Sequence, residues 1–428
     1  MTGWNGRFQG LGGGGWVTGY GAMTLAPAVS EGYAAATTDG GHSTTSPSPV
    51  SWWLTSHGNV DHYLLHDFAS VTLSDMTIIG KQITEQYYQT PPRYSYWNGC
   101  STGGRQGLML AQRYPTLYDG IMARAPAINW DTFLIGEYWM QQVMNRLGAY
   151  PDLCEIHAFT RQAWSVCDAL DGVEDGVIAD DSACEFDPYS VVGSSFLCDG
   201  AEERKFTLAG ATVVEAAWTG PIDAAGKRYA YGLSHDTPLE ALFGSSVDAN
   251  GTRKQNFPIS REWIQTFVMK DQDFPLQNMS FEAYFELFHK SRNEYASIIG
   301  TSDPDLSSFK ALGGKIITWH GLADELIPPD NSVSYYERVL EELPDTYDFY
   351  RLFELPGVGH CGNGPGYQAV RDIDALVQWV EEGVAPEFLQ TANTTTGGNA
   401  TQRLACLWPK KQSSEGIEGS QGTAYICV

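Results

Sequence analysis

Residues 99–103 read GCSTG, which fits the G-x-S-x-G pattern of a nucleophilic serine. The glycines of this pattern allow a sharp turn in which larger side chains would clash. The same residues also fit an ordinary glycine-rich turn, so the flanking elements must decide between the two. Arg93–Asn98 is predicted to be a strand, and Gly104–Tyr114 is predicted to be a helix that Pro115 stops. This context favours Ser101 as a nucleophile.

A nucleophilic serine needs a base and an acid that orients the base, and the chain offers both downstream. Asp324 follows the predicted strand Lys315–Trp319, and His360 lies in a glycine-rich loop after the predicted strand Tyr347–Leu355. A single Asp or His is more often structural, but the order Ser, Asp, His is that of α/β-hydrolase triads. Of the other histidines, His320 is expected to pack beside Asp324 rather than to serve as the base.

Two of the eight cysteines flank the proposed triad. Cys100 directly precedes Ser101 and Cys361 directly follows His360, so a real triad would bring these cysteines within bridging distance. Their disulfide would close a loop of about 260 residues and stabilise the fold by roughly 5 kcal/mol on the chain-entropy model. No pair has the Cys-x-x-Cys spacing of a zinc or redox site, and an even number of widely spaced cysteines favours disulfides.

Strands and helices alternate on both sides of a long central segment, which predicts a parallel α/β sheet. Further strands are expected at Arg7–Leu11, Gly32–Thr38 and Gly120–Ala125, and further helices at Asp67–Tyr88, Ser332–Leu343 and Arg371–Glu382. The alternation is lost between 127 and 308, which we interpret as an inserted lid domain. Residues 1–126 and 309–428 would then form the catalytic domain, with a loop-like tail from Thr391 to Val428.

The charge balance excludes several classes of partner. Lys and Arg contribute 26 positive charges against 51 acidic residues, a net charge of −25. This balance argues against nucleic acid and anionic membranes, both of which need clustered cations. The first residues do not resemble a signal peptide, yet the cysteines and four N-glycosylation sequons indicate a secreted glycoprotein, so the true N-terminus is expected to be missing. The sequons begin at Asn250, Asn278, Asn393 and Asn399.

The segment 98–107, NGCSTGGRQG, resembles the tannase and feruloyl esterase family, whose hallmark is a Cys-Ser, Asp, His-Cys constellation on an α/β-hydrolase fold. The resemblance extends over residues 4–427. It implies that Ser101 is the nucleophile, that His360 acts first as general base and then as general acid, and that Asp324 orients the imidazole. It also implies an oxyanion hole, which a glycine loop after a strand suits, formed by the backbone amides of Thr102 and Gly14.

The resemblance implies a secreted serine esterase that cleaves phenolic-acid esters through an acyl-enzyme. Its substrates would be hydroxycinnamoyl esters of plant polysaccharide or galloyl esters of tannins. The alternatives are another aromatic or small ester on the same triad, or a calcium-stabilised family member without catalytic activity. The acid would lie under the lid, where each of five aromatic residues is more often core than pocket: Trp130, Tyr138, Trp139, Trp263 and Tyr284. The sequence predicts no oligomeric state.

Within the lid, residues 167–177 read CDALDGVEDGV, and this density of carboxylates and glycines suits Ca²⁺, although a solvated acidic loop is an equal alternative. The resemblance implies a structural Ca²⁺ held by the side chains of Asp168, Asp171 and Asp175 and the carbonyls of Val173 and Val177. It also implies the disulfides Cys167–Cys184, Cys406–Cys427 and Cys154–Cys198. Family members carry an additional N-terminal segment with early strands, so an exposed sheet edge is expected here.

Overall fold

The computed structural model describes residues 3–43, 48–198, 202–247, 253–393, 401–415 and 424–428. Its centre is a nine-stranded sheet in the order β13-β14-β15-β12-β11-β6-β5-β1-β2. The strands from β2 to β12 in this order pair in parallel, while β15, β14 and β13 are antiparallel. Their bounds are β1 Arg7–Leu11, β2 Ala34–Ala36, β5 Tyr94–Cys100, β6 Gly120–Arg124, β11 Lys315–Gly321, β12 Tyr350–Leu355, β13 Gln368–Ala369, β14 Phe388–Asn393 and β15 Thr401–Leu407.

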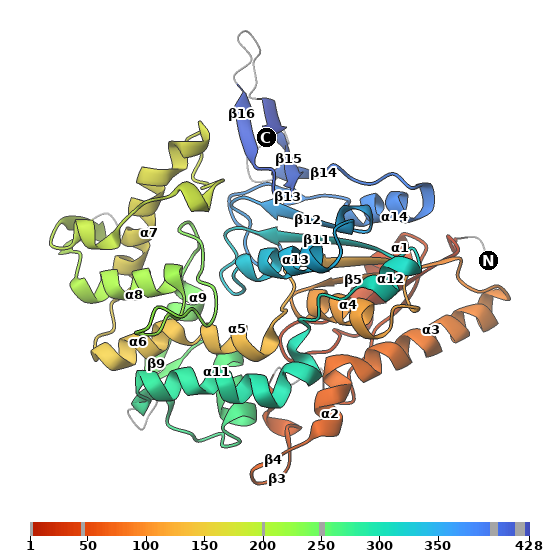
Figure 1. Cartoon of the computed structure of the whole chain (residues 1–428), viewed down its shortest axis with the longest axis horizontal. Helices are drawn as coiled ribbons and strands as arrows, with labels where there is room; N and C mark the ends of the chain where they lie inside the picture. Colours follow the sequence, from red (N-terminus) through yellow and green to blue (C-terminus); the bar gives the residue numbers. More distant parts are fainter. Residues whose placement is uncertain (1–2, 44–47, 199–201, 248–252, 394–400, 416–423) are drawn as a thin grey trace.

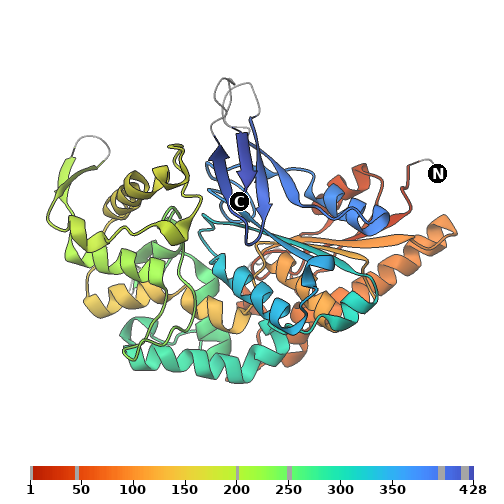
Figure 2. The ribbon, with the colours of Figure 1, turned by 45° about the horizontal axis from the view of Figure 1, so that its top comes forward.

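Helices cover both faces of the sheet, as expected for an α/β fold (Figures 1 and 2). The central strands are accordingly apolar on both sides, as the consecutive buried residues Tyr96 and Trp97 of β5 illustrate. One face packs against α3 Thr72–Tyr88, α4 Thr102–Arg113, α12 Ser307–Ala311 and α13 Asp330–Glu342. The other face packs against α1 Ala22–Ser30 and α14 Asp372–Glu382. The predicted fold class is confirmed.

The expectation of a loop-like tail is wrong, because β14 and β15 extend the sheet beyond β12. The tail also forms the hairpin of β16 Gln412–Glu415 and β17 Ala424–Cys427. Most of the Gly, Ser and Thr that suggested a loop lie between these strands, at 394–400 and 416–423, outside the described residues. The strands themselves carry Thr, which is favoured on a half-buried pleated surface, beside Leu, Ala and Cys.

Two further elements differ from their predictions. The segment predicted as one helix begins with the π-helical turn η2 Asp67–Val71, and α3 leaves Ile79 and Ile83 exposed at 54% and 60%. The buried face of α3 includes Thr77, whose hydroxyl pairs with the Tyr118 hydroxyl at 2.7 Å, and a count of apolar residues does not register such a satisfied polar group. The predicted buried strand at Gly32–Thr38 is the half-buried β2, at the described edge of the sheet.

The residues between β6 and β11 contribute no described strand to the central sheet. They form helices and two small hairpins beside it (Figure 1). The principal helices are α5 Trp130–Gly136, α6 Trp139–Leu147, α7 Leu153–Cys167, α8 Leu208–Thr219, α9 Glu240–Phe243, α10 Pro258–Glu262 and α11 Phe281–Tyr295, with η3 Asp168–Asp171, η4 Asp181–Ala183, η5 Pro188–Val191, η6 Trp263–Val268, η7 Leu276–Asn278 and η8 Ala296–Gly300. The hairpins are β7 Ser195–Cys198 with β8 Glu202–Lys205, and β9 Ser245–Val247 with β10 Arg253–Gln255.

This lid shares one of its hydrophobic cores with an early part of the chain. Trp16, Trp52 and Phe68 pack in the same cluster as Trp130 and Trp263 of the lid. The early segment contains η1 Pro49–Ser51, β3 Leu54–Ser56, β4 Asn59–Val60 and α2 His62–His66. The lid therefore rests on residues that precede β5, and not only on its two connections to the sheet.

All eight cysteines are paired, and the four pairs are those expected from the sequence and the family resemblance. Cys100–Cys361 joins segments 261 residues apart, whereas the other three disulfides join segments at most 44 residues apart. The long-range pair therefore connects the two halves of the chain that flank the lid.

Candidate active site

Ser101 lies at the turn between β5 and α4 with φ 61° and ψ −124°, a backbone conformation that residues other than glycine rarely adopt. Its amide donates to the Arg124 carbonyl at 3.0 Å, which fixes the turn against β6. A Cβ atom at Gly99 would lie 2.4 Å from the backbone of Gly103. The glycine of the motif is therefore required by the close approach of the strand and the helix.

Asp324 and His360 meet at the carboxyl ends of β11 and β12. The Nδ1 atom of His360 lies 2.9 and 3.1 Å from the two carboxylate oxygens of Asp324. Asp324 is completely buried, and its Oδ1 also accepts the amides of Leu326 and Ile327 at 2.9 Å. These contacts orient the imidazole so that Nε2 is left for the serine or the substrate, the arrangement of a triad.

The electrostatics of this pair favour its charged forms. Burial alone would raise the pKa of Asp324, but His360 and His320 hold it well below the usual range. Burial would likewise lower the pKa of His360, but the Asp324 carboxylate and Glu325 raise it above its ordinary value. The imidazolium that forms when His360 takes a proton is therefore stabilised by two neighbouring carboxylates.

Two neighbours of the triad hold it in place. His320 packs beside Asp324 as expected, with Nε2 at 3.0 Å from both Asp324 Oδ2 and the Ile327 carbonyl. Because both partners are acceptors, Nε2 carries the proton and Nδ1 faces the Ser332 hydroxyl at 2.7 Å. Glu325, which the sequence analysis missed, accepts the backbone amide of His360 at 2.9 Å. Its position directly after Asp324 was the only available signal.

Ser101 and His360 line one cavity of about 530 Å³, and the Cys100–Cys361 disulfide joins their loops. The side chain of His360 is 13% exposed while that of Asp324 is 0% exposed, so only the imidazole of this pair can meet a substrate. The structure thus brings all three predicted triad residues to one edge of the sheet.

The glycine loop 12–15 also lines this cavity, but its amides are not equally free. The Gly14 amide, predicted to bind the oxyanion, donates to the Val17 carbonyl at 3.0 Å. Gly15 has no acceptor for its amide among the described residues, and its carbonyl accepts the Thr102 hydroxyl at 2.7 Å. The small bridge between Gly14 and Val17 occupies the Gly14 amide. The Gly15 amide is therefore better placed than the Gly14 amide to bind an oxyanion together with the Thr102 amide.

Apolar side chains, most of them from the lid, form a further part of the cavity wall. The lid contributes Trp130, Phe133, Leu134, Phe257 and Ile259, and the loop after β11 contributes Leu326 and Ile327. Four of the five aromatic candidates, Trp130, Tyr138, Trp263 and Tyr284, are buried in the core shared with the early segment, and of these only Trp130 also lines the cavity. Trp139 instead borders two other cavities, a small one that Phe133 also lines and a larger one of about 890 Å³. Phe133 and Phe257 were missed because neither belongs to a motif.

The acidic loop contains the five residues expected to bind Ca²⁺. The donor set suits a hard cation, and the carbonyls of Val173 and Val177 accept no hydrogen bond from a described residue. The Asp168 carboxylate accepts the amides of residues 175–177, and Asp175 pairs with Arg403. As described, the three carboxylates do not form a group whose ligand atoms all lie within 4.8 Å of one another. Calcium binding here stays a prediction.

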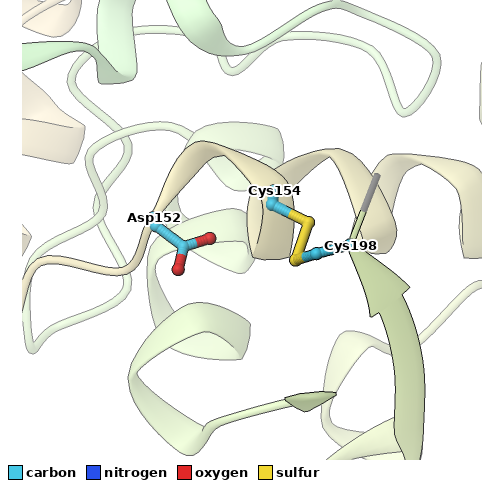
Figure 3. Close-up of side chains that lie close together, drawn as sticks. All are labelled: Asp152, Cys154 and Cys198. Carbon is cyan, nitrogen blue, oxygen red and sulfur yellow. A yellow bond between two sulfur atoms is a disulfide. The ribbon is translucent and has the colours of Figure 1, made fainter. Parts of the chain in front are cut away.

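A second group of possible ligands, Asp152, Cys154 and Cys198, has a simpler explanation. Figure 3 shows the two sulfur atoms joined in a disulfide, so neither is a thiolate ligand. Asp152 caps α7 by accepting the Glu155 amide at 3.0 Å and also pairs with Arg204. These contacts account for the cluster without a metal.

Two of the four predicted N-glycosylation sequons begin at residues that the structure describes. The sequon residue Asn278 is exposed, and the amide of Asn393 donates to the Pro365 carbonyl at 2.9 Å. Asn250 and Asn399 lie outside the described residues. Among the helices of the described chain, none combines the length and the apolar character needed to cross a membrane.

Comparisons with known proteins identify the relatives of this chain. A probable feruloyl esterase of Arthroderma benhamiae is 39% identical over 432 residues, covering 99% of this chain and 80% of that protein. A mono(2-hydroxyethyl) terephthalate hydrolase of Piscinibacter sakaiensis is 28% identical, covering 95% and 76%. The solved tannin acyl hydrolase of Aspergillus niger has a TM-score of 0.90 at 26% identity, covering 100% and 81%. The family model described as "Tannase and feruloyl esterase" matches residues 1–428, and the chain belongs to this family of carboxylic ester hydrolases.

Proposed function

We propose that this enzyme hydrolyses esters of phenolic acids, either hydroxycinnamates on plant polysaccharide or gallates on tannins, through an acyl-enzyme on Ser101. The observation that supports the proposal best is the Ser101 turn facing the His360–Asp324 pair in a cavity whose lid wall is apolar. Such a wall suits an aromatic acyl group better than a sugar. The names of the relatives are consistent with this acyl class.

In the first half-reaction, Ser101 Oγ attacks the ester carbonyl while His360 Nε2 takes the hydroxyl proton. Asp324 stabilises the imidazolium through Nδ1, and the amides of Thr102 and Gly15 hold the oxyanion. His360 then protonates the departing alcohol, which leaves the acyl group on the serine. In the second half-reaction, His360 removes a proton from water, the hydroxide attacks the acyl-enzyme, and the acid departs as Ser101 regains its proton.

Steady-state hydrolysis of methyl ferulate and methyl gallate tests the substrate class, with Ser101→Ala protein as the blank. We expect clear turnover of at least one ester, lost in the variant. If the wild type cleaves 4-nitrophenyl acetate through Ser101 but neither phenolic ester, the enzyme acts on another ester and this proposal fails. If no ester is cleaved, the chain is the inactive alternative.

We further propose that the acidic loop binds a structural Ca²⁺, held by Asp168, Asp171 and Asp175 with the carbonyls of Val173 and Val177. The density of carboxylates and the two carbonyls without donors support this assignment. Ligand binding to the native state alone raises its stability. Calcium added after chelation should therefore raise the melting temperature, and Asp171→Asn should weaken this response. An equal response to Mg²⁺, or none to Ca²⁺, would contradict it.

Secretion and glycosylation are also proposals. Four disulfides favour an oxidising compartment, and the exposed Asn278 offers an accessible glycosylation site. The protein produced by its source cells should appear in their medium, and its mass should fall on treatment with an N-glycosidase. Retention inside the cells in an unglycosylated form would contradict both.

A further inference from the structure

A second cavity, the α1 cavity, lies between α1 and the sheet and adjoins the active-site cavity. It encloses about 550 Å³, which is within the range of small-molecule sites. Asn98 and Arg124, near the carboxyl ends of β5 and β6, line both cavities. A group bound in the α1 cavity therefore lies next to the active site. Its other lining residues include Arg7, Gln9 and Leu11 from alternate positions of β1 and Thr24, Pro27 and Ala28 from one face of α1.

Two deeply buried polar side chains of the α1 cavity lack hydrogen-bond partners. Gln9 is 2% exposed, and its Nε2 atom is buried without a partner. Tyr33 is 7% exposed, and its hydroxyl makes no hydrogen bond within the part of the chain that the structure describes. Burial raises the pKa of Tyr33 to about 12, so its hydroxyl is neutral and can both donate and accept. Polar groups buried this deeply are normally satisfied, which favours a ligand that supplies the partners.

The charged side chains of the α1 cavity favour a neutral ligand. Among its described lining residues, each of the three arginines forms an ion pair with a carboxylate, and the remaining acidic residue, Glu31, is exposed. An anionic ligand would meet no unpaired cation at these residues, whereas a ligand with several hydroxyls can use the amide and the phenol. The ion pairs are Arg7–Glu381 at 2.6 Å, Arg124–Asp372 at 2.6 Å and Arg371–Asp374 at 3.2 Å.

We propose that the α1 cavity binds the sugar of the ester substrate, on the alcohol side of the bond that is cleaved. The apolar lid wall of the active-site cavity suits the acyl group, so the two halves of the ester find surfaces of opposite polarity on the two sides of Ser101. Asn98 lies three residues before Ser101, about 10 Å along an extended chain. A sugar beyond Asn98 can thus stay linked to a carbonyl at the serine. This inference rests on the proposed function and adds the alcohol half of the substrate to it.

The test compares a sugar ester with the methyl ester of the same acid. Feruloyl arabinose is paired with methyl ferulate, and galloyl glucose with methyl gallate. For the acid that the wild type accepts, we expect kcat/KM to be about tenfold or more higher for the sugar ester. A sugar ester and a methyl ester also differ in intrinsic reactivity, but that difference is the same in every variant. A change in the ratio of the two kcat/KM values therefore reports binding of the sugar.

Four variants separate the α1 cavity from its surroundings. Tyr33→Phe removes only the hydroxyl, and Gln9→Met keeps the length of the side chain without its amide, so each should reduce the ratio about fivefold. Thr24→Trp fills the cavity from α1 and should reduce the ratio about tenfold. Val29 lies on the same helix but is 56% exposed and does not line the cavity, so Val29→Trp is the matched control and should leave the ratio unchanged.

Three results would overturn the inference. A wild type that hydrolyses the methyl esters of phenolic acids but shows no preference for the sugar esters would overturn it alone, even if the variants do not fold. A folded Thr24→Trp protein that retains the wild-type ratio, or an equal fall in Val29→Trp, would do the same. A wild type that cleaves 4-nitrophenyl acetate but no phenolic ester would instead overturn the proposed function together with this inference.

Discussion

The edge of the sheet that carries the triad and the lid that faces it are held together by different kinds of interaction. At the sheet edge, Asp324 alone accepts two backbone amides and contacts two histidines, and a disulfide joins loops 261 residues apart. The lid wall consists of packed apolar side chains with the single buried carboxyl group of Glu137. Directional contacts fix the reacting groups, whereas packing shapes the space for the acyl group. Changes at the sheet edge should therefore lower turnover, and changes in the lid should alter substrate preference.

The largest effect is expected from Asp324→Asn. The amide keeps the shape of the carboxylate but removes the charge that stabilises the imidazolium and the acceptor that fixes its tautomer, so kcat should fall about 10⁴-fold. Stopped assays with methyl ferulate and with methyl gallate measure this loss. A less than tenfold loss in a folded variant would show that Asp324 does not orient His360.

Removal of disulfides compares the two regions directly. A Cys100→Ala, Cys361→Ala double variant should lose about 5 kcal/mol of stability on the chain-entropy model and much of its kcat, since Ser101 and His360 are no longer tied together. The lid pair Cys154→Ala, Cys198→Ala should lose about 4 kcal/mol but keep its kcat at low temperature. Denaturant melts and kcat at 10 °C measure both. Equal loss of kcat in the two variants would remove the distinction between the regions.

Phe257→Ala tests the lid wall. Phe257 is half-buried and lines the cavity, so its loss should raise the KM of an aromatic ester several-fold with little change in kcat. Phe281, on a lid helix away from this cavity, provides the control substitution Phe281→Ala. Equal effects of the two substitutions would mean that the wall does not contact the acyl group.

The smallest effect is expected from Glu325→Gln. His360 must be unprotonated to act as a base, so kcat/KM should fall as the pH drops through the pKa of His360. The Glu325 carboxylate helps to raise this pKa. Loss of the Glu325 charge should move this acidic limb to lower pH while the plateau changes little. A pH profile of kcat/KM records the shift, and a limb that stays in place or moves upward would contradict the assignment.

The sequence predicts the sheet edge far better than the lid. Ser101, Asp324 and His360 each follow a strand, and the neighbouring cysteines report that their loops meet. Which amide of the glycine loop is left without an acceptor depends instead on the bridge between Gly14 and Val17, which no local pattern reveals.

In the lid, Trp130 and Trp263 are both buried in the shared core, but only Trp130 also lines the cavity, although both are tryptophans on short helical turns. Only their tertiary neighbours distinguish them. The strands of the tail were missed because the composition of their connections outweighed that of the strands.

The most direct test of the account is to look for the acyl group on Ser101. The enzyme is mixed with excess 4-nitrophenyl ferulate, quenched with acid at successive times, and analysed by intact mass and by peptide mapping. We predict a feruloyl adduct on the peptide that contains Ser101, formed with the release of nitrophenol and absent from the Ser101→Ala protein. A Ser101→Ala protein that hydrolyses this ester at the wild-type rate, without an adduct in either protein, would contradict the mechanism.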